Sequence, residues 1–97
     1  MDYSIYGRWE QGSPVSADQV GRASAALPPE TEGVCVWIEP EEPNVLRLSV
    51  DVEAASFDDA LHRGQAALAE TARAATLSGA ASEVVAMTDE GQAVWTP

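Results

Sequence analysis

The sequence predicts an α+β fold in which an antiparallel sheet is covered on one face by two helices. Two observations support this prediction. Several segments alternate between apolar and polar residues, which is the period of a strand with one buried face. Two other segments follow serine helix caps and place apolar residues three and four positions apart, which is the period of a helix packed along one side.

The N-terminal third predicts a strand and then a short helix. Residues 3–10 alternate, so one side of this strand is expected to be buried. Ser16 and Gln19 have the spacing of a capping box, and a helix over about 17–27 follows them. Pro28-Pro29 is expected to stop this helix, because proline lacks the amide donor and restricts the residue before it.

The middle of the chain predicts a β-hairpin. Residues 34–39 are rich in β-branched side chains and alternate, and residues 45–53 give the clearest alternation in the chain. Between them, Pro40-Glu41-Glu42-Pro43-Asn44 is expected to be a turn, because two prolines interrupt strand pairing. The inward side chains are expected to be Val34, Val36, Ile38, Leu46, Leu48, Val50 and Val52.

The C-terminal part predicts a longer helix and then a strand. Ser56 caps a helix that is expected to run to about residue 77, with Gly79 as its stop signal. Residues 83–88 predict a strand, and Asp89-Glu90-Gly91 is a turn signal. Residues 92–95 are expected to form either a short strand or a packed tail.

These elements predict one domain over residues 1–97. Their order is strand, helix, strand, strand, helix, strand, which is the ferredoxin-like βαββαβ sandwich. Its four-stranded antiparallel sheet is expected to have the spatial order 4-1-3-2, with two helices on one face. Many unrelated functions use this arrangement, so the expected fold indicates no activity.

Charge limits the expected partners. Sixteen acidic residues and five basic ones give a formal charge of −11. Such a chain repels phosphate backbones and anionic lipid, so neither nucleic acid nor a membrane is expected as a partner. No apolar run approaches the roughly 18 residues that cross a bilayer. No basic segment and apolar stretch of a secretory signal is recognised near Met1, so the expected location is the cytoplasm.

The main candidate interaction site is the sheet face turned away from the helices. Large aromatic side chains are unusual on a solvated sheet face, so this face is expected to contact a second copy, another protein or a flat ligand. The alternative is that Trp37 lies under the C-terminal segment of its own chain. The candidate residues are Tyr6, Arg8, Cys35, Trp37, Arg47 and Ser49.

The residues that could support catalysis give weaker signals. Asp58 precedes His62 by four positions, as Asp59 precedes Arg63, so each pair could meet on a helix. An acid–histidine pair could act as a general base, but such pairs usually decorate an exposed helix face. Cys35 has no evident cationic neighbour to activate its thiol. No catalytic residue, cofactor or metal site is predicted.

The function expected from these features is a non-enzymatic interaction or regulatory module that forms a homodimer through the sheet face. Two alternatives stay open. One is a small enzyme or ligand-binding protein of the dimeric α+β barrel type, with a pocket between helices and sheet. The other is an acidic protein that masks a basic partner. A closed pocket with convergent polar groups would favour the enzyme.

Overall fold

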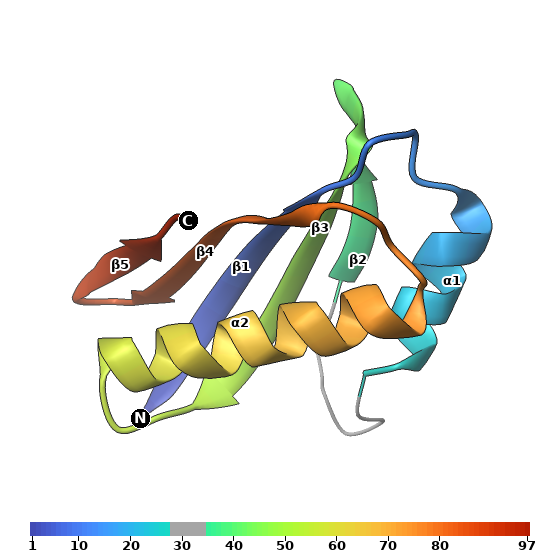
Figure 1. Ribbon diagram of the computed structural model, residues 1–97. Coiled ribbons are helices and arrows are strands. Elements are labelled where there is room, and N and C mark those ends of the chain that lie inside the picture. Colours follow the sequence, from blue (N-terminus) through green and yellow to red (C-terminus); the bar gives the residue numbers. More distant parts are fainter. Residues whose placement is uncertain (28–34) are drawn as a thin grey trace.

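The computed structural model describes residues 1–27 and 35–97, and over these residues it has two helices and a five-stranded antiparallel sheet (Figure 1). The sheet order is β2-β3-β1-β4-β5, so the first four strands have the predicted arrangement. The elements are β1 (Asp2–Glu10), α1 (Ala17–Ala25), β2 (Cys35–Glu39), β3 (Glu42–Glu53), α2 (Phe57–Ala74), β4 (Ala80–Thr88) and β5 (Gly91–Trp95).

The prediction of four strands is wrong, because the C-terminal segment adds a fifth. β5 pairs with β4 from Thr88 opposite Gly91 to Val84 opposite Trp95. Asp89-Glu90 forms the turn between them, and an antiparallel pair needs no longer connection. By pairing with β4, the segment satisfies backbone groups that would otherwise form an open sheet edge.

The hairpin between β2 and β3 also differs from its prediction. β3 begins at Glu42, inside the segment that was expected to be a turn. The register shifts here, since Ile38 faces Leu46 while Glu39 faces Glu42. Pro43 therefore falls in a stretch with no residue opposite on β2, where its missing amide proton interrupts no ladder hydrogen bond.

The helix starts match the sequence, whereas the helix ends differ. Ser16 and Gln19 form the predicted capping box, and the Ser56 hydroxyl accepts a hydrogen bond from the Asp59 amide. α2 ends at Ala74 rather than near residue 77. The predicted stop at Pro28-Pro29 and the strand residue Val34 lie outside the described residues.

Gly79 is not the helix stop but a point of close approach to β1. Its φ of +86° lies in the left-handed region, and a Cβ atom here would overlap the carbonyl oxygen of Glu10. Glycine avoids both penalties, because it has no Cβ atom and accepts positive φ readily. This residue lets the chain pass from the end of α2 to the start of β4.

Both helices pack on the sheet face that carries the inward residues of β3, as predicted. Leu48 is fully buried in a cluster with Ile5, Leu68 and Val84, which joins α2 to the centre of the sheet. A second cluster places α1 over the other part of this face; its buried members are Val15, Ala23, Leu46 and Ala75. The opposite sheet face has no helix over it among the described residues.

The contact between α2 and the sheet depends on Gly64. A Cβ atom at this position would lie 2.7 Å from Cγ2 of Ile5 and 2.9 Å from Cγ1 of Val84. Both of those residues are fully buried, on the adjacent strands β1 and β4. The helix can approach the strands this closely only because residue 64 has no side chain.

We expect Gly64→Ala to destabilise the protein by about 1–3 kcal/mol, because overpacking a filled core outweighs the gain in helix propensity. Gly21→Ala is the matched control, since a Cβ atom in α1 at this position would meet no atom within 4 Å. It should stabilise by up to about 1 kcal/mol. Urea unfolding of both variants measures the difference, and an equal gain in stability would contradict the close approach.

Candidate functional site

The sheet face opposite the helices, here called the open face, carries the outward residues of all five strands. Its members follow from the alternation along each strand and from the registers between neighbours. Among the residues whose side chains the structure describes, the open face includes Asp2, Ser4, Tyr6, Arg8, Glu10, Trp37, Glu39, Arg47, Ser49, Asp51, Glu53, Glu83, Val85, Met87, Gln92 and Val94.

The structure brings the six candidate residues of the sequence into two neighbouring rows across the strands. In the first row Trp37 lies opposite Arg47, and Arg47 lies opposite Arg8. The second row places Cys35, Ser49 and Tyr6 at successive register positions. The predicted surface is therefore continuous over β2, β3 and β1.

Large apolar side chains are exposed on this face. The exposed fractions are 41% for Tyr6, 37% for Trp37, 37% for Met87 and 50% for Val94. The alternative that Trp37 lies beneath the C-terminal segment is wrong, because β5 lies at the opposite edge of the sheet from β2. Tyr6, Met87 and Val94 adjoin one another on β1, β4 and β5, whereas Trp37 stands apart on β2 because Arg47 and Ser49 of β3 lie between it and Tyr6.

Sequence reasoning missed the part of the patch that lies on β4 and β5. Val85 lies between Tyr6 and Val94 in one row, and Met87 lies opposite Ser4 in the next. In β4, Val84, Val85, Ala86 and Met87 are all apolar, so alternation gives no contrast from which to assign a face. The turn at Asp89-Glu90 was the available signal, because it allows a hairpin that extends the sheet.

Carboxylates hold both arginines of the open face in place. Arg8 donates to Glu10 at 2.5 Å and to Glu42 at 2.7 Å, and it also donates to the Ser82 hydroxyl at 2.8 Å. The hydrogen bond with Glu10 is the main reason that the pKa of Arg8 is raised. Arg47 Nε lies 2.9 Å from an oxygen of Glu39. These cations are therefore already neutralised within the chain.

Several carboxylates around the open face have no such cation. Asp2, Asp51 and Glu83 lie at open-face positions of β1, β3 and β4, and Asp89 and Glu90 form the adjoining turn. None of the five has an ion-pair partner among residues 1–27 and 35–97. We call this set the acidic rim.

A groove of about 380 Å³ lies between the rim and the apolar patch. Tyr6 and Met87 line it on one side, together with the rim residues Asp2, Asp89 and Glu90. Its volume is at the lower end of the range typical of small-ligand sites, which is about 300–1,000 Å³. The groove combines an aromatic ring, a thioether and carboxylates, which is a lining suited to a cationic group with an apolar stem.

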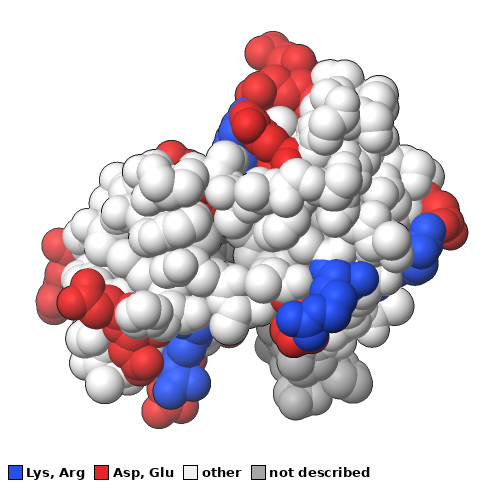
Figure 2. Space-filling view, viewed as in Figure 1, with Lys and Arg blue, Asp and Glu red and all other residues white. Residues whose placement is uncertain are grey.

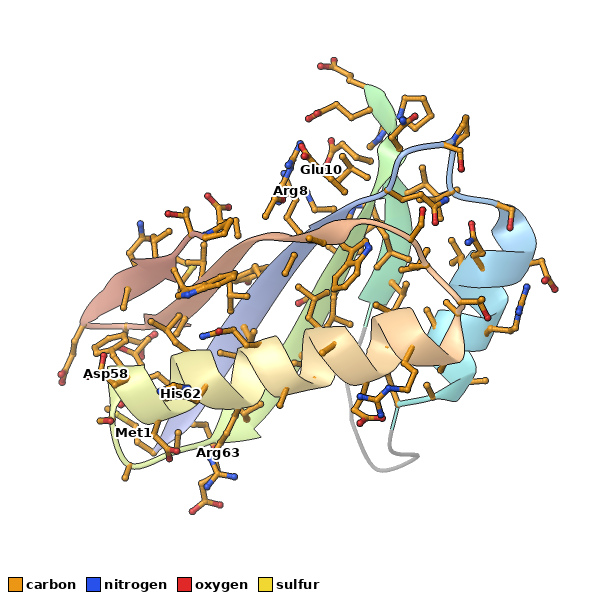
Figure 3. All side chains as sticks on the ribbon, in the orientation of Figure 1. Met1, Arg8, Glu10, Asp58, His62 and Arg63 are labelled. Carbon is orange, nitrogen blue, oxygen red and sulfur yellow. The ribbon has the colours of Figure 1, made fainter. Side chains whose placement is uncertain are left out.

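The acid–histidine pair of α2 is not formed. His62 is exposed, and among the described residues no hydrogen bond or ion pair joins it to Asp58. The neighbouring pair is formed, since Arg63 Nε lies 3.2 Å from a carboxylate oxygen of Asp59. His62 and Arg63 both belong to α2, on the side of the sheet away from the open face (Figure 3). Neither residue contributes to the apolar patch.

Asp59 instead stabilises the start of α2. Its carboxylate accepts a hydrogen bond from the Ala55 amide at 3.0 Å, and this bond is the main cause of its lowered pKa, followed by the bond from Arg63. The carboxylate also lies in the first turn of the helix, where negative charge is favourable. Its role is therefore local and structural.

We expect Asp59→Asn to lower the free energy of unfolding at neutral pH. Because folding lowers the pKa of Asp59, its contribution is present above the unfolded pKa of about 3.9 and is lost as the pH falls through the folded pKa. The stability difference between wild type and variant should therefore shrink below about pH 4. Asp58→Asn is the control, and denaturant unfolding against pH is the measurement. A pH-independent difference would contradict this role.

Other routes to a function were compared with the open face. Neither described helix is long and apolar enough to cross a membrane. In the described part of the chain, no group of three or more His, Cys, Asp or Glu side chains is arranged to hold a metal ion. Comparison with protein-family models, with curated proteins and with solved structures gives no significant match to this chain.

Proposed function

We propose that this chain is a non-enzymatic protein-interaction module that works through the open face of its sheet. One observation supports this proposal above the others. Tyr6, Trp37, Met87 and Val94 are large, exposed and apolar, and all four lie on the open face. Large apolar side chains exposed together on one face of a domain are typical of a contact with another molecule.

The open face is also large enough for a specific protein contact. The strands have 9, 5, 12, 9 and 5 residues, and at about 3.3 Å per residue and about 4.8 Å between strands they present roughly 630 Å². A standard protein–protein interface buries about 800 Å² on each partner. The proposed contact therefore needs the whole of this face and some surface at its edges.

The alternative of an enzyme with a pocket between helices and sheet has less support. At the centre of that layer, the Ile5 and Val84 side chains fill the space over Gly64. Leu68 of α2 is fully buried in the same cluster. A substrate would have to displace these side chains, whereas a partner on the open face displaces only water.

The proposal includes two finer interpretations. We interpret β1 to β4 with α1 and α2 as a ferredoxin-like unit to which β5 is added, and the order β2-β3-β1-β4 supports this view. The cytoplasmic location expected from the sequence is kept as part of the proposal. A second copy of the chain is the occupant that the sequence predicts, and a basic protein is the other.

The double variant Tyr6→Ser/Met87→Ser tests whether these side chains are available to a partner. We expect it to change the free energy of unfolding by no more than about 2 kcal/mol, because each exposed cross-strand contact contributes up to about 1 kcal/mol. Leu48→Ala is the comparator and should cost about 2–5 kcal/mol, since it empties a fully buried site. A cost for the double variant close to that of Leu48→Ala, measured by urea unfolding, would show that these residues serve their own fold.

A further inference from the structure

We infer that the partner of the open face is a basic polypeptide whose apolar side chains are flanked by lysine or arginine, and not a second copy of the chain. This inference rests on the proposed function, since it names the occupant of the same surface. It is argued from charge, from the width of the patch and from the chemistry of the groove.

The first argument is the distribution of charge. All five arginines of the chain are ion-paired, and their partners are Glu10, Glu42, Asp18, Glu39, Asp59 and Glu70. The acidic rim has no such partner, and its residues Asp2, Asp89 and Glu90 line the groove together with the exposed Tyr6 and Met87. The chain therefore supplies no further arginine to this face, and the Met1 ammonium beside the groove donates to the Ala54 carbonyl. A molecule that covers these carboxylates would have to supply positive charge, because a carboxylate removed from water without a cation is unfavourable.

The same distribution opposes a second copy on the open face. A two-fold contact brings the same surface patch of both subunits together. The carboxylates of one rim would then lie against a surface rich in carboxylates and without an unpaired arginine. Like charges brought together in a contact are unfavourable, and two chains of net charge −11 also repel each other at long range. A basic partner would instead be attracted, both within the contact and at long range.

The second argument is the width of the patch. Trp37 lies on β2 and Val94 lies on β5, so exposed apolar side chains occur on both edge strands, with Arg47 and Ser49 of β3 between Trp37 and the others. Four inter-strand spacings amount to about 19 Å. A helix of about 13 residues laid across the strands has this length. Such a helix would cover the open face much as α2 covers the other face (Figure 1).

The third argument is the lining of the groove. Tyr6 and Met87 can contact the aliphatic stem of a lysine or arginine, while Asp2, Asp89 and Glu90 lie around them as acceptors for its charged group. A cation over the Tyr6 ring gains further attraction from the aromatic face. A nucleic acid or an anionic surface would place negative charge here instead. The geometry therefore favours a basic polypeptide with apolar side chains.

The test titrates the purified chain with an amphipathic peptide of leucine and lysine by calorimetry. Two peptides are the controls: one replaces every lysine by glutamate, and the other replaces every leucine by serine. We expect only the leucine–lysine peptide to bind measurably. Its affinity should fall as the salt concentration rises toward about 0.15 M, where the screening length shortens to about 8 Å.

Matched charge variants separate the acidic rim from general attraction to an acidic chain. Asp51→Asn/Glu83→Gln removes two charges at open-face positions, and Glu41→Gln/Asp58→Asn removes two unpaired charges elsewhere. The first pair should weaken peptide binding about five-fold or more, and the second pair less than about two-fold. Equal weakening by the two pairs would overturn the inference.

The other outcomes distinguish this inference from the proposed function. If the wild type sediments as a dimer that Trp37→Glu dissociates without unfolding, a second copy occupies the open face. The inference on the partner then fails, while the interaction module stands. Equal binding of the serine–lysine peptide would also overturn the inference, because the apolar patch would have no part. If Tyr6→Ser/Met87→Ser unfolds the chain, the proposed function fails first.

Discussion

The close approach of α2 to the sheet at Gly64 is the contact on which the rest of the structure depends. With no side chain at this position, Ile5 of β1 and Val84 of β4 pack directly against the helix. These two strands form the centre of the sheet, so the contact determines which face the long helix buries. Since α1 packs on the same side, the opposite face is left without a helix among the described residues (Figure 1). The exposed side chains of that face are thus a consequence of packing on the other side.

Wherever polar and apolar residues alternate clearly, the sequence was sufficient to predict which side chains face the helices and which lie on the open face. In β3 the inward residues Leu46 and Leu48 and the outward residues Arg47 and Ser49 all have the predicted orientation. The same contrast in β1 assigned Tyr6 and Arg8 to the open face. Alternation failed in β4, where apolar residues occupy both faces, and it could not decide whether residues 92–95 pair with a strand or cover a surface. Long-range pairing, which a local pattern does not encode, decides such cases.

The remaining differences also have local physical causes. Pro43 is accepted within β3 because the register shift leaves it without a residue opposite on β2. Gly79 follows α2 as predicted for a helix stop, yet its positive φ serves the passage beside Glu10. The predicted turn at Pro43 and the predicted helix stop at Gly79 are both wrong, although each residue does lie at a local irregularity. The sequence alone did not reveal which neighbouring strand each of these residues lies beside.

The two faces of the sheet also differ in how their charged side chains are paired. On the side that carries the helices, the charged side chains lie mostly toward the edge and uncharged atoms cover much of the centre (Figure 2). The cations of α1 and α2 are each paired with a carboxylate of the same helix. On the open face, Arg8 and Arg47 are paired too, but the acidic rim is not.

Exposed apolar side chains are unfavourable in water, whereas the carboxylates beside them are solvated and become unfavourable only when a partner covers them without supplying positive charge. Natural sequences depart from local rules of this kind mainly at functional sites, where a partner supplies the compensation. The exposed ring of Tyr6 is best covered by apolar surface, whereas the unpaired carboxylates of the groove are best covered by positive charge. Lysine and arginine side chains combine the two in one group, since a long aliphatic stem carries the charge. The same residues therefore explain both why this face is costly in isolation and what chemistry would cover it.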